Sequence, residues 1–144
     1  MTMVPYEIIL VEDSDEDAEL TLRALKRRHF ANNVHRLVDG AAALDYFFSA
    51  DRAVSANALP RVVLLDLKLP KVSGLDVLQR LKADERTRAV PVVVLTSSKE
   101  DRDLAEAYRL GANSYIVKPV EFDKFVESIE TLGMYWMLVN QLPR

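Results

Sequence analysis

Residues 62–78 read VVLLDLKLPKVSGLDVL, and they carry the clearest indication of the fold in the chain. Its first four residues, Val62–Leu65, are all apolar instead of alternating between apolar and polar. A run of this kind is typical of a strand covered on both faces, as in a parallel sheet flanked by helices. From Leu75 onward, leucine recurs at every third position, which predicts a helix with one apolar face. The stretch therefore predicts a strand followed by a helix, with Asp66 directly at the end of the strand.

The same succession of strand and helix patterns continues along the chain. Short apolar runs predict further strands at residues 8–11, 92–95 and 115–117, and a weaker candidate at 34–38. Helical spacing predicts helices that begin near Ser14, over 41–48, after Gly74, after Ser98 and around 122–132. Ser98 with Asp101 matches a capping box, and Gly111 suits the end of the helix that follows. Together these elements predict a doubly wound α/β fold, with helices on both faces of a parallel sheet.

Length and composition predict one globular domain over residues 1–144, with 49% hydrophobic and 28% charged residues. The net charge of -3 and the pI of about 5.4 give no general attraction to nucleic acid or to anionic membranes. Apolar stretches such as 134–139 are far shorter than the roughly 20 residues that span a bilayer, and no signal pattern opens the chain. The lack of cysteine fits a reducing compartment. We therefore expect a cytoplasmic protein.

Two segments depart from the regular pattern. Residues 49–60 are rich in Ala, Ser and Asn and lack periodicity, so we interpret them as an enlarged connection between a helix and a strand. Residues 133–144 form a tail that is strongly apolar around Trp136. Such a tail can pack on the core of its own chain, or it can form an interface with a second copy or with another protein.

Polar residues stand at the carboxyl ends of the predicted strands. In an open parallel sheet, ligands bind beyond these ends. The residues at these positions are Glu12, Asp13, Asp66, Thr96 and Lys118. Three neighbouring carboxylates require a raised pKa, a bound cation or both, and Mg²⁺ prefers such oxygen ligands. Each residue alone is more often a solvated loop carboxylate, a capping hydroxyl or a surface lysine, so the prediction rests on the coincidence of all five.

The five side chains suit phosphoryl transfer. Asp66 would act as the nucleophile and form an aspartyl phosphate. A phosphoryl group in transfer carries negative charge on its equatorial oxygens, which a cation, the ammonium of Lys118 and the hydroxyl of Thr96 would stabilise.

Four blocks of the sequence resemble the receiver domains of bacterial response regulators. These blocks are ILVEDSDED at residues 9–17, VVLLDLKLPKVSGLDVL at 62–78, VPVVVLTSS at 90–98 and GANSYIVKPV at 111–120. The resemblance implies a flavodoxin-like, five-stranded parallel sheet with strand order 2-1-3-4-5. It also implies that Asp66 accepts a phosphoryl group from a sensor histidine kinase, and that the protein is not an enzyme beyond its own phosphorylation and dephosphorylation.

The resemblance also assigns roles to single residues. Glu12, Asp13 and Asp66 would hold Mg²⁺, and Lys68 would add its backbone carbonyl. Thr96 and Lys118 would contact the phosphoryl group, and Tyr115 matches the aromatic switch position that responds to Thr96. Glu12 stands where the family more commonly has aspartate, so its carboxylate reaches one methylene further.

Within the family, three segments look most like the regulators that serve phytochrome histidine kinases: the 49–60 connection, PKVSGLDVL, and the tail GMYWMLVNQLP. A phytochrome-type kinase and a downstream protein are the implied partners. One alternative is a phosphohydrolase that uses Asp66, but Lys68 stands two residues on, where such an enzyme needs an acid. The other is an interaction module that works without phosphorylation, which the complete set of acid, hydroxyl and lysine disfavours.

Overall fold

The computed structural model describes residues 8–27, 34–49, 59–97 and 100–118, together with Asp123, Lys124 and Glu127. Within these residues the chain forms a five-stranded sheet. The strands are β1 (Ile8–Val11), β2 (Val34–Leu37), β3 (Val62–Leu65), β4 (Val92–Thr96) and β5 (Ser114–Val117). All neighbouring strands are parallel and their order is β2-β1-β3-β4-β5, so the predicted flavodoxin-like topology is confirmed.

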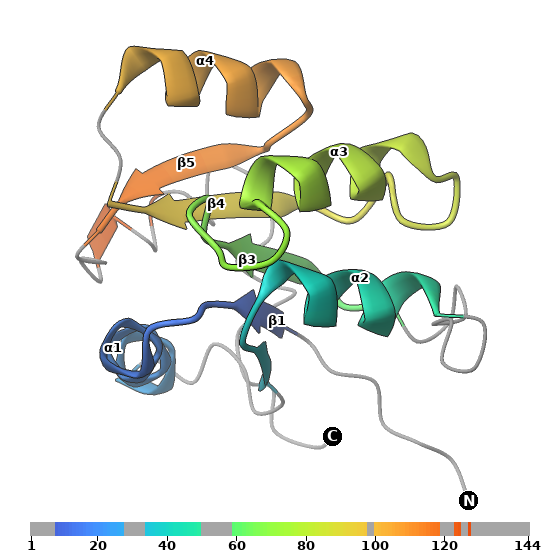
Figure 1. The fold of residues 1–144 in the computed structure, drawn as a ribbon. Coiled ribbons are helices and arrows are strands. Elements are labelled where there is room, and N and C mark those ends of the chain that lie inside the picture. Colours follow the sequence, from blue (N-terminus) through green and yellow to red (C-terminus); the bar gives the residue numbers. More distant parts are fainter. Residues whose placement is uncertain are drawn as a thin grey trace, which may run out of the picture.

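Helices cover both faces of the sheet. They are α1 (Asp15–Arg27), α2 (Gly40–Phe48), α3 (Gly74–Ala83) and α4 (Asp101–Arg109). Figure 1 shows α2, α3 and α4 in a row beside the strands, and their buried residues form one core with Ile9 and Val11 of β1. The buried Ala18 and Leu25 of α1 lie outside that core. Because successive strand residues point to opposite faces, α1 covers the other side of the sheet.

The burial of the strands explains which of them were easy to predict. β1, β3 and β4 are buried at every residue, as expected for central strands covered on both faces. β2 is an edge strand that is only partly buried, and its sequence VHRL includes two polar residues. An edge strand has one fewer neighbour to cover it, so its apolar pattern is weaker.

The start of α4 corrects one prediction. Glu100 is the N-cap residue of this helix and makes no capping bond through its side chain, so the helix begins later than predicted. Ser98 of the predicted capping box lies outside the described residues. Asp101 and Asp103 place negative charge in the first turn, where the helix dipole favours it. The predicted end is confirmed, because Gly111 has a φ of 108°, which favours glycine, directly after the helix.

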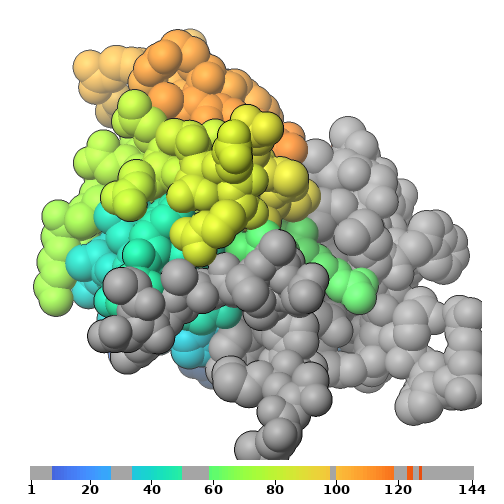
Figure 2. Space-filling model, turned by 90° about the vertical axis from the view of Figure 1, so that its right-hand side faces the viewer, coloured from blue at the N-terminus to red at the C-terminus, as the bar shows by residue number. Residues whose placement is uncertain are grey.

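The edge at which the strands begin is held together by Lys82 at the end of α3. Its Nζ donates to Arg88 O at 3.1 Å, Val90 O at 2.8 Å and Asn113 Oδ1 at 3.3 Å. Figure 2 faces this edge and shows the segment between α3 and β4 in yellow, below the orange α4. Asn113 Oδ1 also accepts from Val92 N, so one polar network joins α3, β4 and the start of β5.

Several predictions fall outside the described residues. They concern the connection at 50–58, the tail at 133–144 and most of the helix around 122–132, of which Asp123, Lys124 and Glu127 are described and helical. Among the helices that the structure describes, none combines the length and apolar character that crossing a membrane requires. The predictions of a single domain over 1–144 and of a homodimer through the tail stay predictions.

Candidate functional site

The carboxyl edge of the sheet brings together the five residues that the sequence singled out. Glu12 and Asp13 follow β1, Asp66 follows β3, Thr96 ends β4 and Lys118 follows β5. The strand register explains this meeting, because residue 11 pairs with 65 and residue 96 pairs with 117. Glu12, Asp66 and Thr96 are 1%, 6% and 0% exposed, whereas Asp13 is exposed. A buried polar cluster open on one side therefore lies at this edge.

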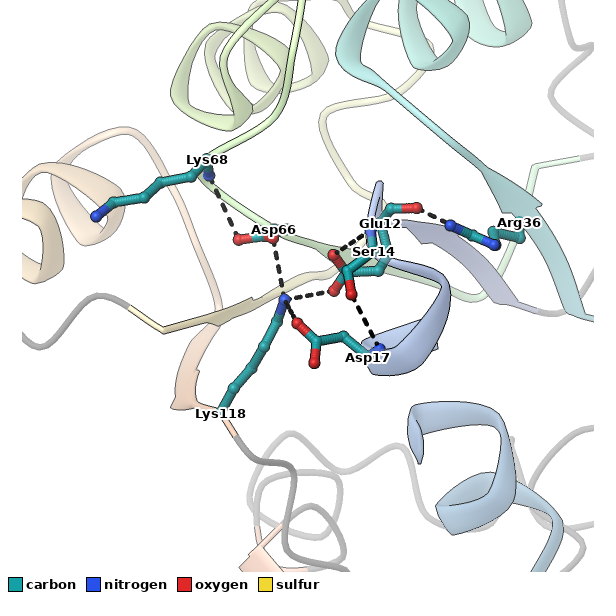
Figure 3. Close-up of polar contacts among 7 residues, drawn as sticks. All are labelled: Glu12, Ser14, Asp17, Arg36, Asp66, Lys68 and Lys118. Carbon is teal, nitrogen blue, oxygen red and sulfur yellow. Dashed lines mark hydrogen bonds and ion pairs between the residues drawn. The ribbon is translucent and has the colours of Figure 1, made fainter. Parts of the chain in front are cut away.

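Lys118 lies at the centre of the cluster (Figure 3). Its Nζ is 2.5 Å from Glu12 Oε1, 2.9 Å from Asp17 Oδ2 and 3.0 Å from Asp66 Oδ2. Its side chain is 9% exposed. Burial lowers the pKa of Lys118, but the hydrogen bonds to the three carboxylates outweigh burial and raise the pKa above its ordinary value. The ammonium is therefore charged at neutral pH.

At Glu12, in contrast to Lys118, burial has the larger influence on the pKa. Burial raises the pKa of Glu12 to about 7, and the negative charge of Asp66 adds to the rise, although Lys118 opposes it. Its second oxygen, Oε2, accepts from the backbone N of Ser14 at 3.3 Å. Burial therefore disfavours the charged form of Glu12, whereas the Lys118 ammonium, and a cation when one is bound, would favour it.

Hydrogen bonds to neighbouring strands hold the backbone at Glu12 and Asp66 in place. Glu12 N donates to Leu37 O at 2.9 Å, and Arg36 Nε donates to Glu12 O at 2.9 Å, so β2 holds both polar groups of the Glu12 backbone. Asp66 N donates to Val11 O at 3.1 Å. Lys68 N donates to Asp66 Oδ1 at 3.3 Å, which orients that carboxylate, while the Lys68 side chain is exposed.

Gly74 allows α3 to begin directly against the Asp66 segment. A Cβ at this position would lie 2.1 Å from Asp66 O and 2.6 Å from Leu67 Cα, far inside van der Waals contact. Gly74 N also donates to Leu67 O at 2.8 Å. Gly74 is therefore required by the close approach of the backbone, which fixes the loop that carries Asp66.

Three carboxylates in the described part of the chain could hold a divalent cation. Glu12, Asp13 and Asp66 each offer an oxygen, and these oxygens lie within 4.8 Å of one another. Carboxylate oxygens are suitable ligands for a hard ion such as Mg²⁺, which also keeps several waters and so tolerates a site with an exposed side at Asp13. The donor set therefore fits the predicted cation. The role of the Lys68 backbone carbonyl stays a prediction.

Thr96 and Tyr115 lie on neighbouring strands next to this cluster. Thr96 is fully buried, and its backbone O accepts from Lys118 N at 2.8 Å. Tyr115 is half-buried on the edge strand β5, opposite Val94, and packs against the core beneath α4. The predicted roles of Thr96 and Tyr115 as switch residues stay predictions.

Sequence reasoning missed two residues of the site. Asp17 lies in the first turn of α1 and contacts Lys118, and Arg36 at the end of β2 binds the Glu12 backbone. The sequence carries a signal for the start of α1, because Ser14 precedes three acidic residues. That signal predicts a helix start, but it does not predict a contact with a lysine 101 positions away.

Similar proteins support the assignment of a family. The chain is 45% identical over 139 residues to the probable methanogenesis regulatory protein FilR2 of Methanothrix harundinacea (strain 6Ac), with 96% of this chain and 88% of FilR2 covered. The solved bacteriophytochrome response regulator RtBRR is 48% identical with a TM-score of 0.82, and the match covers 98% of this chain and 85% of that chain.

Two solved structures of cyanobacterial-type regulators are similar over the full length of their chains. They are the Mn(2+)-bound form of response regulator Rcp1 and the phosphorylated cyanobacterial phytochrome response regulator RcpA. Each is 32% identical to this chain, with TM-scores of 0.74 and 0.75, over 97% and 98% of this chain and 100% of theirs. The family described as response regulator receiver domain matches residues 8–130. This chain therefore belongs to the response regulator receiver domain family.

Proposed function

We propose that this chain is a phosphorylation-controlled signalling switch, in which Asp66 accepts a phosphoryl group from a sensor histidine kinase in the cytoplasm. The observation that carries the proposal is the position of Lys118, whose Nζ contacts both Glu12 and Asp66. An ammonium between a candidate nucleophile and a candidate metal ligand lies where negative charge develops during phosphoryl transfer.

The carboxylates of Glu12, Asp13 and Asp66, with the Lys68 backbone carbonyl, are the proposed ligands of Mg²⁺. When bound, Mg²⁺ would supply positive charge that draws the phosphoryl oxygens toward Asp66 and stabilises the charge they gain. The Mn(2+)-bound form of Rcp1 supports the choice of a divalent cation for this family.

The chemical step belongs to Asp66. One carboxylate oxygen of Asp66 forms a bond to phosphorus while the N–P bond of the phosphohistidine breaks, and the imidazole leaves with the electron pair. Lys118 and Thr96 donate to the phosphoryl oxygens through their ammonium and hydroxyl groups. Water later cleaves the acyl phosphate and returns the free carboxylate and inorganic phosphate. The phosphorylated structure of RcpA supports this assignment.

The proposed output follows from Thr96 and Tyr115. When Thr96 turns toward the phosphoryl group, Tyr115 moves inward and changes the surface of β5 and α4 that a downstream protein contacts. The likeness to RtBRR and RcpA supports a phytochrome-type kinase as the upstream partner. Phosphotransfer measured from a panel of histidine kinases should be fastest with a phytochrome-type kinase, and a faster kinase of another class would refute this partner.

The central test is covalent modification of Asp66. Incubation with a small phosphodonor and Mg²⁺ should add one phosphate to the wild-type protein, as measured by intact mass. Asp66→Asn should abolish the addition, whereas Asp76→Asn, which changes an exposed aspartate in the first turn of α3, should not. Omission of Mg²⁺ should also abolish it. A phosphate that persists in Asp66→Asn would refute the assignment of this residue.

A further inference from the structure

Four hydrogen bonds close a ring between the start of α1 and the end of β5. Ser14 N donates to Glu12 Oε2 at 3.3 Å, and Asp17 N donates to Ser14 Oγ at 3.2 Å. Lys118 Nζ then bonds both Asp17 Oδ2 at 2.9 Å and Glu12 Oε1 at 2.5 Å (Figure 3). The ring ties the helix start to the lysine through two carboxylates.

Asp17 occupies an unusual place in this ring. Ser14 caps α1 and Asp17 is three residues on, where the side chain in a capping box reaches back to the backbone N of the capping residue. Here Glu12 Oε2 accepts from that N instead. The Asp17 carboxylate is therefore released from capping and binds the ammonium of Lys118.

Asp17 also differs from the other two partners of Lys118. Glu12 and Asp66 belong to the group of carboxylates that can hold a cation, and Asp17 does not. A cation that recruits oxygens of Glu12 and Asp66 competes with Lys118 for them. The Lys118 side chain is 9% exposed, and a buried ammonium without an anionic partner is costly. Asp17 is the partner that Lys118 can keep.

We propose that Asp17 is a positioning residue, which holds the Lys118 ammonium when Glu12, Asp13 and Asp66 bind a divalent cation. Asp17 thereby lowers the cost of metal binding and keeps the ammonium beside Asp66. The inference rests on the proposed function for the identity of the cation site, but its test reads metal binding and not phosphorylation.

The test is a double-mutant cycle on the Mg²⁺ dissociation constant, measured by isothermal titration calorimetry. Asp17→Asn should weaken Mg²⁺ binding about fivefold, the size expected when a charged hydrogen bond at a partly exposed site is lost. In the Lys118→Met background the same substitution should change the constant less than about twofold, because the coupling through Lys118 is gone. Glu16→Gln removes the same charge from the neighbouring exposed residue and should have little effect in either background.

Two further measurements separate positioning from a merely structural role. Asp17→Glu keeps a carboxylate on the same turn and should restore Mg²⁺ affinity to within about twofold of wild type. In Mg²⁺-saturated wild-type protein, NMR of ¹⁵N-labelled lysine should show a slowly exchanging Lys118 ammonium, and Asp17→Asn should broaden that signal. Thermal unfolding of each variant reports whether the start of α1 is still formed.

The outcomes distinguish this inference from the proposed function. Wild-type Mg²⁺ affinity in Asp17→Asn, or an equal loss in the Lys118→Met background, overturns the role of Asp17 even when Asp66 is phosphorylated normally. If the double-mutant cycle shows the expected coupling between Asp17 and Lys118 but Asp66 takes up no phosphate, the role of Asp17 is supported and the proposed function alone is overturned. Failure of the wild-type protein to bind Mg²⁺ overturns both.

Discussion

Lys118 and Lys82 lie at opposite edges of the same sheet, and their ammonium groups have different kinds of partner. Lys118 contacts three carboxylates at the edge where the strands end. Lys82 donates to three neutral oxygens at the edge where the strands begin, two of them backbone carbonyls. The pKa of Lys118 is raised by its acidic partners despite burial, whereas burial lowers the pKa of Lys82.

The different partners indicate different roles for the two lysines: Lys118 takes part in the chemistry of the site, and Lys82 stabilises the fold. A cation or a phosphoryl group can rearrange a cluster of charges, because each new charge changes which pairs are favourable. Neutral oxygens offer no such rearrangement, and the part-buried bond to Val90 O spares that carbonyl the cost of lacking a donor. We therefore interpret the Lys118 edge as the functional edge and the Lys82 edge as one that stabilises the fold.

The largest expected effect is on phosphorylation. Lys118→Met should slow phosphate incorporation by about 100-fold or more, because a charged donor to the transferring group is lost. Lys82→Met should leave the rate within about twofold of wild type, because Lys82 contacts no residue of the site. Time courses of intact mass with a small phosphodonor measure both rates. Equal rates of phosphate incorporation in the two variants would contradict the interpretation that only the Lys118 edge is functional.

The next effect concerns the glycines of the two edges. Gly74→Ala should lower the free energy of unfolding by about 3 kcal/mol or more, since its Cβ would collide with the backbone of Asp66 and Leu67. Gly111→Ala should lower the free energy of unfolding by only about 1 kcal/mol, because its φ of 108° disfavours a side chain and its Cβ would meet one side-chain atom, Lys82 Cγ, at 2.9 Å, and no backbone. Urea unfolding compares the two variants. A Gly74→Ala protein as stable as Gly111→Ala would contradict the packing at Asp66.

A smaller effect is expected from Lys82 itself. Lys82→Met should lower the free energy of unfolding by about 1 kcal/mol, because the part-buried carbonyl of Val90 loses its donor, whereas water can replace the exposed bond to Arg88 O. Addition of Mg²⁺ should not recover this loss, since the affected groups lie away from the carboxylates. Urea unfolding with and without Mg²⁺ tests both statements, and recovery by Mg²⁺ would show that the two edges are coupled.

The smallest effect is a dependence on pH. The folded pKa of Lys82 lies below its ordinary value of 10.5, so between the two values the unfolded chain binds more protons than the folded one. The free energy of unfolding should therefore rise with pH through this window, and Lys82→Met should remove that rise. Lys118 has a raised pKa, so its contribution is present below 10.5 and is lost only at higher pH. NMR titration of the lysine ¹³Cε signals should show Lys82 losing its proton first, and the reverse order would contradict the comparison.

Much of the fold could be predicted from apolar periodicity. The bounds of β1 and β3 were predicted without error, because every residue of these central strands is buried. The end of β2 was displaced by one residue, since Val38 after this edge strand is apolar but 52% exposed. The start of α4 was predicted directly after Ser98, but the helix begins at Asp101, because a local capping pattern does not fix where a helix begins.

The succession of strands and helices and the polar residues at the strand ends could be predicted from the sequence, because both depend on the order of apolar and polar residues along the chain. The folded arrangement was needed to show that Asp17 and Arg36 join these residues, and that Lys118 lies between three carboxylates. It also showed why Gly74 must lack a side chain. These contacts join segments far apart in sequence, and their distances depend on strand register and helix packing, which no local pattern encodes.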